Sequence, residues 1–285
     1  MQDWSLHRRA FAFVAAAPIG WLLAFFLVPL AIVWAYSFGH NEGLTAIRIS
    51  GTFANYSHAL EPLYLGIFLK SVAVAALTTL ICLIVGFPVA MAIAFAQPKN
   101  KPWLLLLVML PFWTNLLIRT FAVNQIIRNE GLLNTVLLKA GMITAPLKMT
   151  YTDTAVLIGM VYVYLPLMVL PLFAALDRFD RRLLEAGYDL YASRWQVLRR
   201  VILPIVKPGI VAGSILVFVP SLGAYVIPRV LGGGKNMMVG NFIELQFGQG
   251  KNWPLGAAIS MLLLIVVTIA LVYYTRAVNG EKRDG

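Results

Sequence analysis

The sequence predicts an all-α membrane protein with six transmembrane helices, forming a single transmembrane domain over residues 1–285. Hydrophobic residues make up 60% of the 285 positions, charged residues only 12%, and the mean hydropathy is +0.80. This composition lies outside the usual range of soluble domains. Six apolar windows account for it, each close to the length of about 20 residues that crosses a hydrocarbon core of about 30 Å.

The expected spans lack Asp and Glu and contain almost no Lys or Arg. They cover residues 10–38, 71–96, 103–123, 154–176, 207–228 and 254–275. The first span is too long to be a cleaved signal peptide and is followed by further spans, so we expect it to remain as a membrane anchor. An even number of spans places both termini on the same side of the membrane.

Lys and Arg indicate the orientation, because cytoplasmic segments carry an excess of them. With the N-terminus inside, 13 of the 23 basic residues lie on cytoplasmic segments, nine lie on the other face, and Lys207 is at a boundary. The thirteen are Arg8, Arg9, Lys99, Lys101, Arg178, Arg181, Arg182, Arg194, Arg199, Arg200, Arg276, Lys282 and Arg283. Six of them belong to one loop, residues 177–204. The net charge of +11 therefore fits a membrane topology better than nucleic-acid binding.

Prolines occur in each of the first five spans and interrupt the backbone hydrogen bonds there. They are Pro18, Pro29, Pro88, Pro111, Pro166, Pro171 and Pro220. Such breaks are tolerated where neighbouring helices or a water-filled cavity satisfy the freed carbonyls. Aromatic and amide side chains beside the prolines are candidate translocation-pathway residues: Trp113, Asn115, Tyr162 and Tyr164. Ordinary helix bending with interfacial aromatic residues is the alternative interpretation.

The sequence offers no metal site and no catalytic arrangement. The lone cysteine, Cys82, lies within the second span, and the three histidines, His7, His40 and His58, lack ligand spacing. No span contains a carboxylate, and no Ser/His/Asp or Gly-x-Ser-x-Gly pattern is visible. We therefore expect a protein that is not an enzyme, with no metal and no cofactor bound by this chain.

Residues 231–236 resemble a phosphate-binding loop only superficially. The earlier glycine of that motif is replaced by Arg229, and Asn236 stands where a magnesium-binding Ser or Thr would follow the lysine. We interpret the segment as a flexible external turn. Any nucleotide energy would then be supplied by another subunit.

The cytoplasmic loop is predicted to fold as two capped helices. Asp180 can cap the first, which carries Leu183, Leu184, Gly187, Leu190 and Tyr191 at helical spacing, with Arg181 placed to pair with Glu185. Ser193 and Gln196 match a capping box for the second, with an apolar stripe of Trp195, Leu198, Val201 and Ile202 up to Leu203-Pro204. Such a rigid knob, joined directly to a span, can transmit force. A solvated loop that merely satisfies the charge rule is the alternative.

These residues resemble a known family. Glu185-Ala186-Gly187 with Asp189-Leu190, Ala192-Ser193 and Ile202-Leu203-Pro204 is similar to the EAA loop of the permease subunits of bacterial binding-protein-dependent ABC importers. Residues 111–119, 158–162, 165–171, 231–233 and 252–254 resemble the spermidine/putrescine permease subfamily in the same order. The resemblance covers nearly the whole chain from the second half of the first span onwards.

The resemblance implies an importer built from two permease subunits, two cytoplasmic ATPases that bind ATP and Mg²⁺, and a periplasmic solute-binding protein. It makes residues 177–204 the coupling loop, between spans four and five, that docks on an ATPase. The coupling residues carried over are Glu185, Ala186, Gly187, Asp189, Tyr191, Ser193 and Pro204. Glu185 would be the polar anchor, and Ala186 and Gly187 would allow close approach. Two departures are Gly187 in place of alanine and Tyr191 in place of the usual turn glycine, from which we expect a less tight turn or a reshaped contact.

The resemblance leaves the solute open. Ala224 and Arg229 stand where polyamine-type relatives often have carboxylates, and an arginine opposes the passage of a cation. Glu244, Asp153 or the second permease can compensate, and Trp113, Tyr162 and Tyr225 can hold cations over their rings. A polyamine such as putrescine or spermidine is expected. An opine, an amino acid derivative or an aminophosphonate is the alternative that Arg229 favours.

Two further classes stay open on the residues alone. An ion-coupled secondary transporter is disfavoured by the missing internal repeat and by the lack of carboxylates in the spans. A membrane signalling or structural protein would use the same knob without moving a solute. The resemblance implies a multi-pass protein of the bacterial inner membrane, in contact with lipid and with no nucleic-acid partner, and both termini in the cytoplasm.

Overall fold

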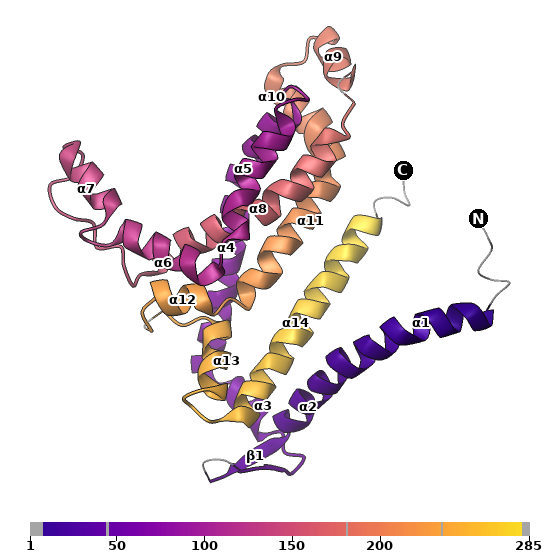
Figure 1. Cartoon of the computed structure of the whole chain (residues 1–285), viewed down its shortest axis with the longest axis vertical. Coiled ribbons are helices and arrows are strands. Elements are labelled where there is room, and N and C mark those ends of the chain that lie inside the picture. The colour runs from indigo at the N-terminus through magenta and orange to yellow at the C-terminus, as the bar shows by residue number, and fades with distance from the viewer. Residues whose placement is uncertain (1–7, 44–45, 181, 235, 281–285) are drawn as a thin grey trace. The chain divides into compact units, whose positions relative to one another are not determined.

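The computed structural model describes residues 8–280 apart from 44, 45, 181 and 235, and most of them lie in helices (Figure 1). The predicted all-α class is confirmed, with one small β-hairpin in addition. Contacts divide the chain into two compact units, residues 1–65 with 243–269 and residues 66–242 with 270–285. Each unit is described by itself.

The first unit combines the N-terminal helices, a hairpin and most of the C-terminal helix. Its elements are α1 (Arg8–Leu22), the π-helix η2 (Leu23–Leu27), α2 (Val28–Ser37), β1 (Gly39–Glu42), β2 (Ala46–Ile49), α3 (Ala54–Ala59) and α14 (Trp253–Gly280). Pro29 stands in the first turn of α2, where a missing N–H costs little. The hairpin is antiparallel, and Asn55 Nδ2 fastens its start by donating to the carbonyl oxygens of Ser37 (3.0 Å) and Gly39 (2.7 Å).

The second unit holds the remaining helices. They are α4 (Pro62–Ala94), α5 (Lys101–Trp113), α6 (Leu116–Ile127), α7 (Leu132–Lys139), α8 (Asp153–Asp177), α9 (Arg182–Asp189), α10 (Arg194–Val197), the π-helix η3 (Leu198–Ile202), α11 (Leu203–Leu222), α12 (Val226–Leu231) and α13 (Val239–Phe247). The helices α4 and α13 each begin or end a few residues beyond the boundary of the unit.

Five helical stretches among the described residues are long and apolar enough to span a membrane. They are Val14–Ser37, Pro62–Ala94, Asp153–Asp177, Arg194–Leu222 and Trp253–Val272. The second begins before the predicted 71–96 because Lys70 lies inside α4, where its Nζ is 2.7 Å from Asp153 Oδ1. A sixth span is formed only if two helices that meet at a sharp bend are counted together.

The predicted third span, residues 103–123, is not one straight helix. It is divided between α5 and α6, and the helical stretches Lys101–Trp113 and Leu116–Lys139 meet at 94°. Asn115 Oδ1 accepts a hydrogen bond from the backbone N–H of Leu117 (2.8 Å) and starts the new helix there. Since α5 is only about 20 Å long, it does not cross a hydrocarbon core by itself.

The predicted fifth span, residues 207–228, also differs at both ends. It is longer at its N-terminal end, because α10 and η3 continue into α11, and it stops at Leu222. The chain then forms the separate short helix α12. The wider turns of η3 directly precede Pro204, the second residue of α11, within this continuous helical stretch.

Two glycines allow α11 to lie directly against α8 (Figure 1). A Cβ atom at Gly209 would approach the Pro171 carbonyl oxygen to 2.8 Å and Ala175 Cβ to 2.6 Å, and one at Gly213 would reach 2.8 Å from Met168 Sδ. Spacing of small residues by four places both on one face of the helix. The close α8–α11 contact therefore depends on these two positions.

Candidate functional site

The first helix of the loop at residues 177–204, α9, begins at an aspartate cap. Asp180 Oδ1 accepts a hydrogen bond from the backbone N–H of Arg182 (3.0 Å), as its position in the sequence indicated. The expected pairing of Arg181 with Glu185 lies outside the described residues. Glu185, Ala186 and Asp189 are exposed along α9 and free of the chain's own core. They can contact a partner.

Gly187 lies against another part of the same loop. A Cβ atom at this position would lie 3.3 Å from Val197 Cγ2, and Val197 is buried. Gly187 therefore allows a close contact between α9 and α10, and its expected role in close approach to another subunit stays a prediction. An alanine would need the valine to move by a few tenths of an ångström.

The turn after α9 is tight, although Tyr191 occupies it. The N–H of Ala192 donates to the Gly187 carbonyl (3.1 Å) and the N–H of Tyr191 to the Tyr188 carbonyl (2.9 Å), which is the Schellman arrangement. Tyr191 has a φ of +58°, in the left-handed region that favours glycine. The expectation of a less tight turn is wrong: the backbone keeps the glycine geometry at a cost of about 1–2 kcal/mol.

The second helix of the loop, α10, begins with the predicted capping box. Ser193 Oγ accepts from the backbone N–H of Gln196 (3.3 Å), and Gln196 Oε1 accepts from the backbone N–H of Ser193 (2.8 Å). Both terminal donors are thus satisfied within four residues. Trp195 does not join the predicted apolar stripe, because it is 66% exposed and lines a hollow of about 320 Å³ with Gln196, Arg199 and Arg200.

The loop is anchored in the main hydrophobic core of the second unit. Val197 and Ile202 are buried in the same cluster as Leu172 and Leu176 of α8 and Val206 of α11. The helices α9 and α10 lie beyond the ends of α8 and α11 (Figure 1). The loop therefore packs directly against the ends of two spanning helices.

An apolar surface on the loop faces outwards. Tyr191 is 97% exposed and Leu190 81% exposed, at the end of the first helix and in the turn that follows it. Together with Trp195 they stand beside the exposed Glu185 region. A partner protein that covers them would gain apolar burial, and large exposed apolar groups on a polar segment are typical of interaction sites.

The candidate pathway residues fall into two groups. Asn115, Tyr164 and Trp113 lie at the α5–α6 bend or on α8, where Asn115 caps α6 and the Tyr164 hydroxyl donates to the Pro220 carbonyl (3.3 Å). Asn115 and Tyr164 therefore stabilise the fold, whereas Trp113 is exposed. Tyr162 and Tyr225 are partly exposed on α8 and at the start of α12 and are available to other groups.

The helices α6, α8 and α12 pack against one another and gather most of these residues in one region. Arg229 is exposed on α12, whereas Ala224 is buried in the cluster that also contains Val123, Met160 and Ile227. A carboxylate at position 224 would have to displace that packing. Glu244 belongs to the first unit, where it is half-buried on α13.

Arg119 is a buried charge that the sequence analysis did not select as a site residue. It is 8% exposed on α6, and its Nε and Nη1 atoms have no hydrogen-bond partner among the described residues. The Phe112 ring lies 5.5 Å from its Cζ atom. A cation–π contact is worth about 0.5–2 kcal/mol, less than the about 3–5 kcal/mol at stake when a buried charge lacks its partner. The sequence did contain a signal for this residue, because Arg119 is a charged residue inside the apolar window 103–123.

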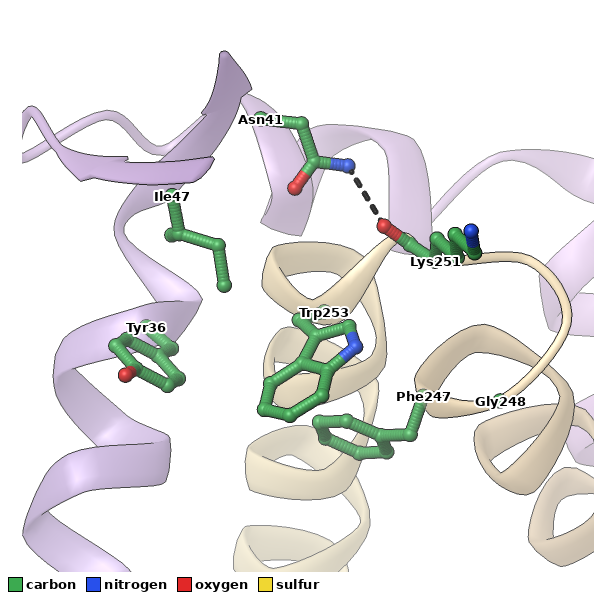
Figure 2. Close-up of a pocket in the computed structure, with 7 residues that line it drawn as sticks. All are labelled: Tyr36, Asn41, Ile47, Phe247, Gly248, Lys251 and Trp253. Carbon is green, nitrogen blue, oxygen red and sulfur yellow. Dashed lines mark hydrogen bonds between the residues drawn. The ribbon is translucent and has the colours of Figure 1, made fainter. Parts of the chain in front are cut away.

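The first unit has its own hollow, of about 450 Å³, between the hairpin and the turn that precedes α14 (Figure 2). The Trp253 ring packs edge-on against Tyr36 and Phe247, at centroid distances of 6.4 and 5.8 Å. Asn41 Nδ2 donates to the Lys251 carbonyl (3.1 Å), as Figure 2 shows. Trp253 therefore has a structural role, because its ring contacts both the end of α2 and the end of α13.

Other site types find little support among the described residues. No group of three or more His, Cys, Asp or Glu side chains is placed to hold a metal ion in that part of the chain. In the phosphate-loop lookalike, Gly233 and Gly234 adopt positive φ values of 60° and 74°, as expected of a turn. Lys235 of the same segment lies outside the described residues.

The geometry agrees with comparisons to known proteins. Residues 7–279 match the family model described as the binding-protein-dependent transport system inner membrane component. The chain is 41% identical over 257 residues to the spermidine/putrescine transport system permease protein PotB of Haemophilus influenzae, covering 90% of each chain. It is 40% identical to PotB of Escherichia coli, covering 91% of this chain and 94% of that one, and 28% identical to the E. coli permease YdcU.

Solved structures share the fold at low sequence identity. A bacterial alginate ABC transporter, in complex with its alginate pentasaccharide-bound periplasmic protein, matches with a TM-score of 0.74 at 16% identity, covering 96% of both chains. The methionine transporter MetNI matches with a TM-score of 0.57 at 17% identity, covering 77% of this chain and 98% of that one.

The predicted importer class is confirmed, and the ion-coupled carrier is disfavoured by the same matches. The chain is a transport subunit and not an enzyme. It belongs to the family of binding-protein-dependent transport system inner membrane components, the permease subunits of bacterial ABC importers.

Proposed function

We propose that this chain is one of two permease subunits of an ATP-driven importer of polyamines, with putrescine and spermidine as solutes. The observation that carries the solute assignment is identity of about 40% over about 90% of both chains to permeases named for these two polyamines. YdcU, which has no solute in its name, is only 28% identical. Identity spread over the whole chain supports a shared pathway as well as a shared fold.

Energy would enter through the cytoplasmic loop. The exposed surface of Glu185, Leu190, Tyr191 and Trp195 would dock on an ATPase, and the buried anchor at Val197 and Ile202 would transmit closure of the ATPases to α8 and α11. Closure would then rock the helices between inward-open and outward-open states. ATP and Mg²⁺ would be bound by the two partner ATPases, and a periplasmic binding protein would deliver the solute.

A polyamine is a multivalent cation, and aromatic rings can hold it without a carboxylate. Tyr162, Tyr225 and Trp113 are exposed or partly exposed on elements of the second unit. The second candidate is an opine, an amino acid derivative or an aminophosphonate. It is favoured by the exposed Arg229 on α12, which would attract an anionic group.

The orientation that we propose has both termini in the cytoplasm. It is supported by the excess of Lys and Arg on the segments that this orientation places inside. The ion pair between Lys101, at the start of α5, and Asp177, at the end of α8, places these two helix ends on one face. Reporter fusions test this orientation: alkaline phosphatase fused after Gly285 should be inactive and a cytoplasmic fluorescent protein active. The reverse pattern would refute it.

The solute assignment is tested on the complete transporter. The periplasmic binding protein of the same transporter should be titrated calorimetrically with putrescine, spermidine, an opine and an aminophosphonate. Uptake of the same radiolabelled compounds should then be measured in cells that lack other polyamine importers. We expect binding and ATP-dependent uptake of at least one polyamine only. Uptake of an opine or aminophosphonate without a polyamine would replace the proposal by its second candidate.

A further inference from the structure

The buried guanidinium of Arg119 lies deep in the span region of the second unit. It is within electrostatic range of the Tyr164 hydroxyl, which in turn donates to the Pro220 carbonyl of α11. Tyr164 stands about 20 Å along α8 from its Asp177 end, at a rise of about 1.5 Å a residue. Since the hydrocarbon core is about 30 Å thick, Arg119 is at membrane depth, where a charge needs a partner.

The described residues supply no paired anion for Arg119. Their ion pairs involve other cations, namely His40, Arg48, His58, Lys70 and Lys101. None of the five straight spanning stretches carries Asp or Glu between its first and last residues, and Glu130, in the stretch Leu116–Lys139 that contains Arg119, is exposed in the turn after α6. Phe112 contacts the guanidinium through its ring but carries no charge to neutralise it. The missing anion must therefore come from another molecule.

Three sources can be compared by their charge. A polyamine is itself a cation, so the proposed solute does not neutralise Arg119. A second copy of this chain would bring a second Arg119 and no carboxylate inside its described spans. Lipid acyl chains would suit the exposed Leu117, Ile118 and Phe121 of the same helix but offer no negative charge at that depth.

We propose that Arg119 is an interface site for a carboxylate, supplied by an Asp or Glu within a span of a second, different permease subunit. The inference rests on the proposed function, because a cationic solute excludes the cargo as the source of the anion. The exposed apolar surface of α6 would be buried in the same interface. The pair would make a heterodimer more stable than either homodimer, since unpaired buried charges are disfavoured in both alternatives.

The test measures assembly in the complete transporter. Tagged Arg119→Met and Arg119→Lys variants are expressed with the second permease, the ATPase and the binding protein, and the co-purified second permease is quantified. We expect Arg119→Met to lower it at least fivefold and Arg119→Lys, which keeps the charge, less than twofold. Arg128→Met is the matched control, because Arg128 is exposed at the end of the same helix and its Nη1 donates to Gln125. It should change nothing.

A double-mutant cycle identifies the partner group. Each Asp or Glu within the apolar spans of the second permease is changed to its amide, alone and together with Arg119→Met. We expect one amide variant to match Arg119→Met, with the double variant no worse than either single variant. Independent, multiplicative losses for every carboxylate would overturn the proposal. So would normal assembly of Arg119→Met with an altered solute preference.

The two hypotheses fail separately. Co-purification of the second permease requires no solute. It therefore tests the Arg119–carboxylate pair even if the wild-type transporter does not import polyamines. Absence of polyamine uptake with an intact Arg119–carboxylate coupling would refute the proposed solute alone. Polyamine uptake without such coupling would refute the interface alone.

Discussion

The loop at residues 177–204 and the α6 region both depart from a simple series of straight spans, yet different contacts determine them. In the loop, Asp180 caps α9 and Ser193 caps α10 through partners two or three residues away. Around α6, burial of Arg119 depends on α8 and α12, which are distant in the sequence. Local hydrogen bonds therefore shape the loop, and long-range packing shapes the membrane region.

This difference separates two kinds of energetic role. Loop residues other than the buried anchor at Val197 and Ile202 lie on a small exposed segment, so changing them leaves the core contacts in place. Residues between the spanning helices act on the whole unit, because their neighbours belong to several elements. Substitutions in the membrane region should therefore lower global stability, whereas substitutions in the loop should alter coupling or local opening.

The largest effect is expected for Gly209→Leu. Its side chain would meet the backbone of Pro171 and Ala175 Cβ, which cannot move away as a flexible side chain could. Overpacking of this kind costs about 3 kcal/mol or more. We expect loss of monodisperse protein in detergent, measured by size-exclusion chromatography and thermal unfolding. Gly66→Leu is the control, since nothing lies within 4 Å of its Cβ position. Equal behaviour of both variants would refute the close α8–α11 contact.

Sequence reasoning succeeded where the determining contacts are local. The Ser193–Gln196 capping box, the Asp180 cap and the composition of the spans are all set by neighbouring residues. It failed at the 94° bend after Trp113, because both helices there are apolar and a bend leaves hydropathy unchanged. The burial of Arg119 could not be predicted either, because it depends on which helices contact α6.

In the candidate site, too, sequence reasoning predicted the features that depend on local spacing and missed those that depend on packing. Glu185 and Asp189 could be placed on an exposed helix from sequence spacing alone. That Gly187 packs on Val197, while Trp195 points outwards, depends on the angle between two short helices. Helical periodicity gives the face of each helix but not the direction in which that face is turned.

Glu185→Lys tests the loop as the coupling element. The Glu185 side chain is exposed on α9 and is not part of the core, so membrane insertion and thermal stability should stay unchanged. ATP-dependent uptake should fall at least tenfold. Charge reversal at a docking surface is expected to weaken the complex with the ATPase. Glu130→Lys, on an exposed segment between α6 and α7, is the matched charge reversal and should leave uptake normal. Normal uptake by Glu185→Lys would remove the coupling assignment.

Ser193→Ala should have a smaller and purely local effect. Loss of the cap costs about 1 kcal/mol, because the Gln196 N–H loses its side-chain acceptor. Amide hydrogen exchange over residues 193–198 should then be about fivefold faster, since about 1.4 kcal/mol corresponds to tenfold. Exchange in α8 should stay the same, and faster exchange there would show that the loop and the core do not open separately. Ser193→Thr, which keeps a hydroxyl, is the conservative control.

The smallest effect is expected at Tyr191, where backbone strain and side-chain contact can be separated. Tyr191→Gly removes the left-handed strain and should slow local exchange severalfold, a gain of about 1 kcal/mol in the turn. Tyr191→Ala keeps the strain but loses the exposed ring, so the turn should exchange as in the wild type. If the ring contacts the ATPase, both variants should lower uptake about equally. Should Tyr191→Gly alone lower it, the strained backbone rather than the ring would be the feature that coupling requires.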